Sequence, residues 1–274
     1  MRVALVQLAY GDAEPVCDRV ARVAALVRAQ AGHDLVVLPE LWAPGGFSYR
    51  SWPQRAEGLD GPTVTAMAEA ARDAGVVLHA GSIVETAAEG TPRGEQGRGL
   101  WNTSVVLGPD GALLATYRKV HRFGFGSGEP VLIEAGTDVV SVDVPLPASG
   151  GAPVRVGLAT CYDLRFPELF RRLLDDGARL AVVPAAWPAA RVEHWTLLGR
   201  ARALENQMPL VALNTAGTHA GHRMGGCSQV VDAAGAVVAS ASPDDEQVLS
   251  VEVDLDAAAA LRESFPVLAD RRLG

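Results

Sequence analysis

Short apolar runs alternate with amphipathic stretches along most of the chain. Apolar runs of this length are typical of buried strands, and apolar residues that recur every three or four positions are typical of helices. The apolar runs predict strands at residues 3–8, 35–38, 76–83, 104–107, 113–117, 139–144, 154–160, 180–184, 210–214, 228–232, 236–239 and 248–253. The amphipathic stretches predict helices from 16 to near 32, and at 63–74, 167–176, 193–206 and 256–264. Strands alternating with helices predict an α/β fold.

Three segments of the first half of the chain recur in the same order in the second half. The matched pairs are 2–5 with 155–158, 36–42 with 181–187, and 104–117 with 228–241. The third pair predicts a hairpin in each half, because turn-forming residues separate two apolar runs. Halves of this kind can pack their sheets face to face with the helices outside. No Pro/Ser-rich or charged linker separates them, so we expect one domain over residues 1–274.

The charge balance narrows the choice of partner. The chain has 24 basic and 32 acidic residues and a formal charge of −8, the wrong sign for nucleic acid or an anionic membrane. Its apolar runs are all shorter than the roughly 20 residues that span a bilayer, and residues 1–10 resemble a strand more than a signal peptide.

The chain has three cysteines, Cys17, Cys161 and Cys227, and no CxxC spacing, which argues against a disulfide framework or a structural zinc site. We therefore expect a cytoplasmic enzyme that acts on a small molecule.

Lys119 is the one lysine among the 24 basic residues. A chain that uses arginine almost everywhere can satisfy general surface charge without lysine. Lysine is required where a compact ammonium group is needed, because the planar guanidinium cannot replace it there. Lys119 is therefore a candidate functional residue, and an incidental surface lysine is an equally weighted alternative.

Cys161 directly follows the predicted strand at 154–160, and Glu40 ends the apolar run 35–39. Cys161 precedes the predicted helix at 167–176, where a helix N-terminus would favour the thiolate form of a nucleophile. A buried core cysteine is the alternative. Glu40 stands where the repeat has Ala185, so a charge is present in one copy only. It is a candidate general base, and a solvated loop glutamate is the alternative.

The sequence gives little support for a metal or a dinucleotide. His219 and His222 form a weak metal pattern without a third ligand. The glycine-rich stretch 124–128 follows a polar segment and opens no predicted helix, unlike a dinucleotide-binding loop. We expect neither a metal nor a cofactor.

Three separated motifs resemble those of the carbon–nitrogen hydrolase, or nitrilase, superfamily. They are LPEL at 38–41, YRKVH at 117–121 and TCYDLRFPE at 160–168. The stretches 200–206 and 265–272 also resemble the family, so the resemblance covers almost the whole chain. It implies a four-layer αββα sandwich of two β-sheets flanked by helices, assembled as a homodimer or larger homo-oligomer.

The resemblance also implies a role for each motif residue. Cys161 would attack the amide carbon and form a thioester. Glu40 would accept the thiol proton, protonate the leaving ammonia and then activate water. Lys119 and the backbone N–H of Tyr162 would hold the oxygen that becomes negative in each tetrahedral intermediate.

Many members of the family have a second active-site glutamate shortly after the lysine. Glu129, in the glycine-rich loop 124–130, is our candidate, and Glu134 is the alternative. With these residues, the family's reaction uses neither a metal nor a cofactor.

The residues after the cysteine bear on the substrate. Members that hydrolyse nitriles generally have Trp-Glu after the cysteine, whereas this chain has Tyr162-Asp163. Members that hydrolyse N-carbamoyl amino acids tend to have two adjacent arginines there, and only Arg165 is present here. The motif most resembles the ω-amidase and deaminated-glutathione-amidase branch, which implies hydrolysis of a small carboxylate-bearing amide to acid and ammonia. An N-carbamoyl amidohydrolase and a non-catalytic binding subunit of the same fold are the alternatives.

Overall fold

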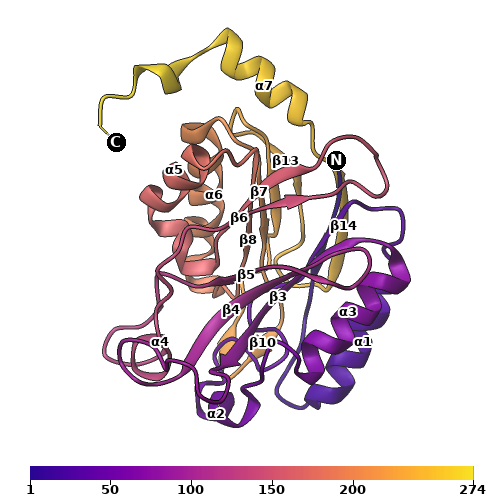
Figure 1. Cartoon of the computed structure of the whole chain (residues 1–274), viewed down its shortest axis with the longest axis vertical. Helices are drawn as coiled ribbons and strands as arrows, with labels where there is room; N and C mark the ends of the chain where they lie inside the picture. The colour runs from indigo at the N-terminus through magenta and orange to yellow at the C-terminus, as the bar shows by residue number, and fades with distance from the viewer. Residues whose placement is uncertain (274) are drawn as a thin grey trace.

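Two six-stranded β-sheets form the centre of the molecule (Figure 1). The computed structural model describes residues 1–273. The first sheet has the spatial order β14 (Gln247–Glu252), β1 (Arg2–Gln7), β2 (Leu35–Val37), β3 (Val77–Thr86), β4 (Leu100–Leu107), β5 (Leu113–Arg118). The second has the order β6 (Ser141–Val144), β7 (Val154–Leu158), β8 (Leu180–Pro184), β9 (Leu210–Leu213), β12 (Gln229–Val231), β13 (Val237–Ser240). A separate two-residue pair joins β10 (Thr218–His219) and β11 (His222–Arg223).

The two sheets have the same topology, which confirms the internal repeat. Each begins with an antiparallel edge strand, β14 or β6. Three parallel strands follow, β1–β2–β3 in one sheet and β7–β8–β9 in the other. Each sheet ends in an antiparallel hairpin, β4–β5 or β12–β13, as the third repeated segment predicts. The parallel strands are almost wholly apolar because both of their faces are buried.

Helices cover the outer face of each sheet, so the expected αββα sandwich is confirmed (Figure 1). The pair α1 (Val16–Arg28) and α3 (Pro62–Ala74) packs on the first sheet. The pair α5 (Pro167–Asp175) and α6 (Val192–Asn206) packs on the second. A Pro at the first position of α3 and Gly75 after its end, with φ of 65°, bound that helix as the sequence predicts.

The main core lies between the sheets. Leu5, Val37 and Val77 from the first sheet belong to the same buried cluster as Val156 and Val182 from the second. The alternate residues of the first sheet face α1 and α3 instead. Because each buried Val or Leu contributes about 1.5–3 kcal/mol, these layers stabilise the strand ends that carry the polar residues described below.

The predicted element boundaries differ from the observed ones mainly where polar residues are buried. Strand β3 runs on to Thr86 and β4 begins at Leu100, since Glu85 and Thr103 are buried and hydrogen-bonded to each other. Strand β7 ends at Leu158, before the predicted end at 160. The sequence pattern also missed the one-turn helices α2 (Trp52–Arg55) and α4 (Glu129–Leu132), and the β10–β11 pair.

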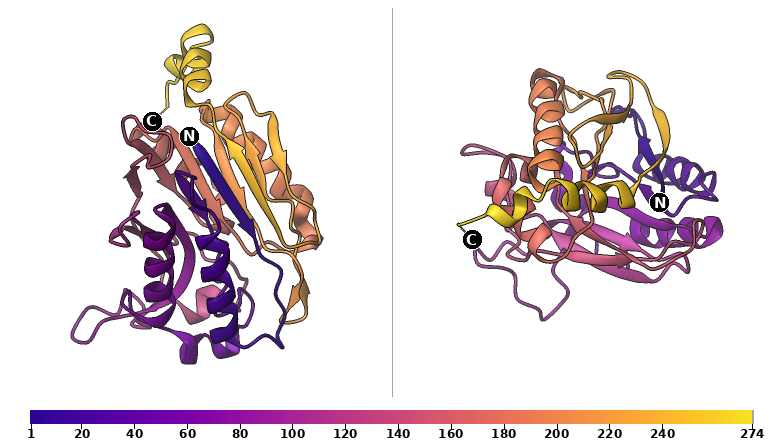
Figure 2. Two further views of the ribbon diagram at one scale, coloured as in Figure 1. Left: turned by 90° about the vertical axis from the view of Figure 1, so that its right-hand side faces the viewer. Right: turned by 90° about the horizontal axis from the view of Figure 1, so that it is seen from above.

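Helix α7 (Leu255–Ser264) lies outside the sandwich, beyond the end of the sheets (Figure 2). The Asp254 side chain caps it by accepting the N–H groups of Asp256 and Ala257. Among its residues only Ala258 is buried, and Phe265 after it is 61 % exposed. Within residues 1–273, every helix is too short or too polar to span a bilayer.

Candidate active site

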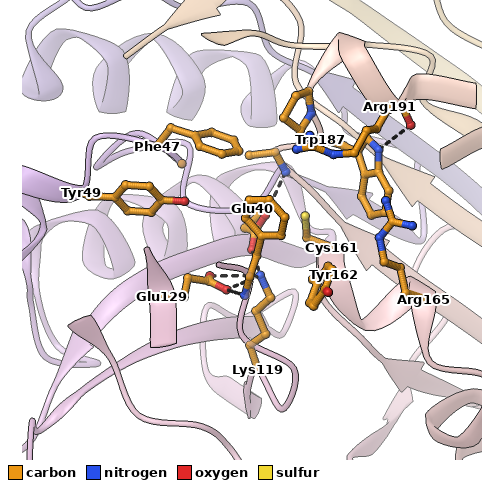
Figure 3. A pocket seen from close by; sticks show the side chains of 14 residues that line it. Glu40, Phe47, Tyr49, Lys119, Glu129, Cys161, Tyr162, Arg165, Trp187 and Arg191 are labelled. Carbon is orange, nitrogen blue, oxygen red and sulfur yellow. Dashed lines mark hydrogen bonds and ion pairs between the residues drawn. The ribbon is translucent and has the colours of Figure 1, made fainter. Parts of the chain in front are cut away.

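Cys161 stands at a sharp turn between β7 and the 3₁₀ helix η2 (Cys161–Arg165). Its φ is 49°, in the left-handed region that residues other than glycine seldom adopt. Asp163 holds this turn: its Oδ2 accepts the N–H of Thr160 at 2.8 Å and the hydroxyl of Tyr117 at 2.7 Å. The turn directs the Cys161 side chain into a pocket, where it lies near Glu40 (Figure 3).

Glu40 follows β2 and is 3 % exposed, so the interpretation as a solvated loop residue is wrong. Its Oε1 accepts hydrogen bonds from Lys119 Nζ at 2.7 Å and from Asn102 Nδ2 at 2.8 Å. Its Oε2 accepts the N–H of Ala186 at 2.9 Å. Ala186 follows β8, so the second half of the repeat supplies a backbone donor to the carboxylate of the first.

Lys119 directly follows β5 and is 2 % exposed, which rules out the incidental surface lysine. Its Nζ lies 2.7 Å from Glu40 and 2.9 Å from Glu129 (Figure 3). Burial disfavours the ammonium form, but the two carboxylates outweigh burial and hold the pKa of Lys119 well above its ordinary value. The side chain therefore carries its charge throughout the neutral pH range.

Glu129 begins α4 and is 3 % exposed. One carboxylate oxygen accepts the N–H of Phe123, and the other accepts an N–H of Asn102 at 2.9 Å. Burial raises the pKa of Glu129, with Lys119 opposing the rise. The alternative candidate, Glu134, accepts the N–H groups of Gln96 and Arg98 at the base of another loop and does not line the pocket.

The expected thiolate at a helix N-terminus is wrong. Helix α5 begins at Pro167, so η2 separates Cys161 from it. Burial raises the pKa of the Cys161 thiol well above its ordinary value, and the charge of Glu40 raises it further, against the opposing charge of Lys119. The thiol is therefore neutral at rest, and a nucleophilic attack needs a base to take its proton. The Glu40 carboxylate is the adjacent group of that kind.

The pocket around Cys161 has two unlike sides (Figure 3). Phe47, Tyr49 and Glu129 line one side. The opposite side carries two arginines: the guanidinium of Arg165 lies 4.7 Å from the ring centre of Trp187, and that of Arg191 lies 5.3 Å from the ring centre of Phe123. Tyr162 packs edge-on against Phe123, with 5.3 Å between ring centres. The pocket can thus hold a small molecule between a buried acid–base cluster and a pair of cations.

Sequence reasoning missed Asn102, Arg191 and the aromatic wall. Asn102 is the third residue of β4, and the strand expected from the sequence began only at residue 104. The sequence hint is weak: Asn102 is a polar residue next to an apolar strand, and a buried amide side chain needs hydrogen-bond partners. Arg191 precedes α6 and has no local pattern that separates it from the other arginines.

A Cys–Glu–Lys cluster on an αββα sandwich defines a class of hydrolase, and sequence comparison agrees with it. The family described as carbon–nitrogen hydrolase matches residues 2–263. The chain belongs to this family.

Known proteins similar to this chain include named amidases. A 2-oxoglutaramate amidase of Paenarthrobacter nicotinovorans is 45 % identical over 270 residues, which cover 98 % of this chain and 89 % of that protein. The human omega-amidase NIT2 is 33 % identical over 99 % of this chain and 95 % of its own length. The crystal structure of XC1258 from Xanthomonas campestris, a CN-hydrolase superfamily protein with an arsenic adduct in its active site, covers all of this chain and 98 % of its own, with a TM-score of 0.86 and 32 % identity.

Proposed function

We propose that this amidase hydrolyses the monoamide of a short dicarboxylic acid to the diacid and ammonia, as an ω-amidase does. The single observation that carries the proposal is the pair Arg165 and Arg191 on the side of the pocket opposite Glu129 (Figure 3). Similarity to the 2-oxoglutaramate amidase and to the omega-amidases supports the same substrate class.

The two arginines are suited to an anion. Neither guanidinium makes an ion pair with a carboxylate among residues 1–273; Arg165 contacts the ring of His194 at 3.2 Å and the face of Trp187. Burial lowers the pKa of Arg165, and the charge of Arg191 lowers it further. Two unpaired like charges close to each other favour a bound carboxylate, which a guanidinium recognises through two parallel hydrogen bonds.

In the proposed reaction the amide carbon lies at Cys161 Sγ and the far carboxylate lies at the arginines. Glu40 takes the thiol proton as sulfur attacks the carbonyl carbon. The negative oxygen of the tetrahedral intermediate is held by Lys119 Nζ and the backbone N–H of Tyr162. When the C–N bond breaks, Glu40 returns the proton to nitrogen, ammonia leaves, and a thioester remains on Cys161.

Hydrolysis of the thioester reverses the roles. Glu40 takes a proton from water, hydroxide adds to the thioester carbon, and the same donors hold the second oxyanion. The C–S bond then breaks, and the proton on Glu40 returns to sulfur. Glu129 does not touch the reacting atoms in this scheme; its carboxylate, 2.9 Å from Lys119 Nζ, holds the ammonium charged and in place.

The proposal also covers the domain organisation, the oligomeric state and the cellular compartment of the enzyme. We infer one domain over residues 1–274, assembled as a homodimer or larger homo-oligomer. Exposed apolar side chains on α6, Leu197 at 65 % and Leu204 at 56 %, together with Phe265 beyond α7, support association. A reactive thiol at Cys161 supports a reducing compartment, the cytoplasm. Light scattering of the purified protein measures the assembly directly.

Ammonia release tests the substrate class. The panel contains 2-oxoglutaramate, succinamate, butyramide, N-carbamoyl amino acids and nitriles, with Cys161→Ala as the blank. We expect release from the two carboxylated amides, little from butyramide, and none in the blank. Release from carbamoyl compounds alone would overturn the substrate class and keep the nucleophile. No release from any compound would favour the binding subunit.

A further inference from the structure

Among residues 1–273, Asn102 is the one uncharged residue whose side chain bridges the two carboxylates of the site. It lies in β4 and is 1 % exposed. Its amide nitrogen donates one hydrogen to Glu40 Oε1 at 2.8 Å and the other to Glu129 Oε1 at 2.9 Å. Lys119 Nζ reaches the same two oxygens, at 2.7 and 3.0 Å. Two donors, one charged and one neutral, therefore connect the same pair of acceptors.

The charges of the cluster explain why a second donor is needed. Two buried carboxylates beside one ammonium leave one negative charge uncompensated. The outer carboxylate oxygens accept the backbone N–H groups of Ala186 and Phe123, so the inner ones depend on Lys119 and Asn102. Hydrogen bonds from N–H groups favour the ionised form of a carboxyl group. An amide supplies two of them and cannot itself take up or release a proton.

The orientation of the amide is determined by the same contacts. A flipped amide would turn its oxygen toward two carboxylates. In the observed orientation, Asn102 Oδ1 is buried and has no hydrogen-bond partner among the described residues. A buried acceptor without a hydrogen bond is destabilising. The observed orientation leaves Oδ1 in that state, and in return both N–H groups donate to the carboxylates.

We propose that Asn102 is a positioning residue that holds Glu40 and Glu129 around Lys119 as two carboxylates, so that Glu40 is free to accept the Cys161 proton. This inference rests on the proposed function, in which Cys161 is the nucleophile. The other titratable groups that face the two carboxylates are Lys119, Cys161, Tyr49 and Tyr10. Burial raises the pKa of both tyrosines, so their hydroxyls stay neutral in the pH range of the test.

The test compares Asn102→Leu, which keeps the branched shape and the number of side-chain heavy atoms and removes both donors, with Thr103→Val on the same strand. Thr103 is a matched control, because it is also buried and donates to a carboxylate, that of Glu85, outside the site. The measurement is ammonia release from 2-oxoglutaramate as kcat and kcat/KM between about pH 5 and 10. Asn102→Asp adds a third carboxylate as a second probe.

We expect Asn102→Leu to lower kcat at neutral pH by about 10- to 100-fold for each lost hydrogen bond to a charged group. The carboxylate forms lose their donors, so the acid limb of the profile moves to higher pH by about one unit or more, and part of kcat returns at high pH. Asn102→Asp should shift the limb further in the same direction. Thr103→Val should keep the wild-type profile, whatever its effect on thermal stability.

An unshifted acid limb in Asn102→Leu would overturn the inference, even if kcat fell, because a packing defect alone lowers the rate at every pH. Circular dichroism and thermal unfolding check that each variant is folded, and Asn102→Ser replaces the leucine variant if that one is not. The two proposals fail separately. Activity in Cys161→Ala would overturn the proposed function, whereas wild-type behaviour of the Asn102 variants beside an inactive Cys161→Ala would overturn this inference alone.

Discussion

Replacing Lys119 with arginine keeps the charge and tests whether the site needs a compact ammonium. The Nζ atom is buried between two carboxylates, at 2.7 Å from Glu40 and 2.9 Å from Glu129. A guanidinium has the same charge but is larger and planar, and it cannot place one nitrogen at that point without displacing a carboxylate. The structure therefore predicts that Lys119→Arg loses the donor that we propose holds the oxyanion.

The size of the loss follows from two separate effects. Losing one oxyanion donor costs about 3–4 kcal/mol of transition-state stabilisation, or about 10²- to 10³-fold in kcat. Forcing extra atoms into a site where Lys119 is only 2 % exposed costs about 1–3 kcal/mol of folding free energy. For a chain of this size, such a loss lowers Tm by about 2–10 °C. The rate should thus fall far more than the stability.

The assay is ammonia release at saturating 2-oxoglutaramate, with thermal unfolding measured on the same sample. Arg118→Lys is the matched control, since Arg118 is the neighbouring residue and pairs with Glu85 at 2.6 Å from a partly exposed position. We expect it to keep nearly full activity, because Arg118 pairs with Glu85 and does not line the pocket. If Lys119→Arg kept more than about a tenth of the wild-type kcat, the oxyanion role argued for this lysine would be refuted.

Three further predictions follow from the contacts of the site. Glu40→Gln should lower kcat for ammonia release by about 10²- to 10⁴-fold, because the variant has no carboxylate beside Cys161 to take the thiol proton. A wild-type kcat in this variant would contradict the role of Glu40 as the base. Asp163→Asn should lower the free energy of unfolding by about 3 kcal/mol or more, because the buried Asp163 carboxylate accepts four hydrogen bonds. Urea denaturation measures this loss, and a loss below about 1 kcal/mol would count against the role of this turn. Arg165→Leu should raise KM for succinamate by about 10-fold or more and leave butyramide hydrolysis unchanged; parallel losses on both substrates would exclude a carboxylate contact.

The fold was largely predictable because the apolar patterns that specify its strands are local, and because they occur in both halves of the chain. Parallel strands buried on both faces appear as short apolar runs, and the repeated segments predict two similar sheets. The polar extensions of β3 and β4 were not predictable in this way. Glu85 finds hydrogen-bond partners in Thr103 and Arg118 on neighbouring strands, and such partners are not visible in the pattern of any one segment alone.

The reactive centre was predictable where a residue departs from its surroundings. Lys119 departs from the use of arginine in the rest of the chain, and Glu40 departs from Ala185 in the repeat. Asn102 has no such signal, because its importance lies in two carboxylates brought to it by other segments. The protonation of Cys161 was mispredicted for a related reason. A helix that follows closely in the sequence suggests a thiolate. In the folded protein, burial and the charge of Glu40 raise the pKa of Cys161 and favour the neutral thiol instead.

The repeat also explains how a duplicated scaffold carries a single site. Glu40 follows β2, and Ala186 follows the equivalent strand β8, at the same end of the two parallel arrays. A second glutamate, at the equivalent position 185, would bury one more charge, and an alanine at position 40 would leave no base. With one of each, the Ala186 N–H donates to Glu40 Oε2 at 2.9 Å, so one half supplies the charge and the other half the donor that stabilises it. Cys161 follows β7 in the second half and Lys119 follows β5 in the first, so the reaction proposed above needs both halves, and the two sheets must stay in contact for it.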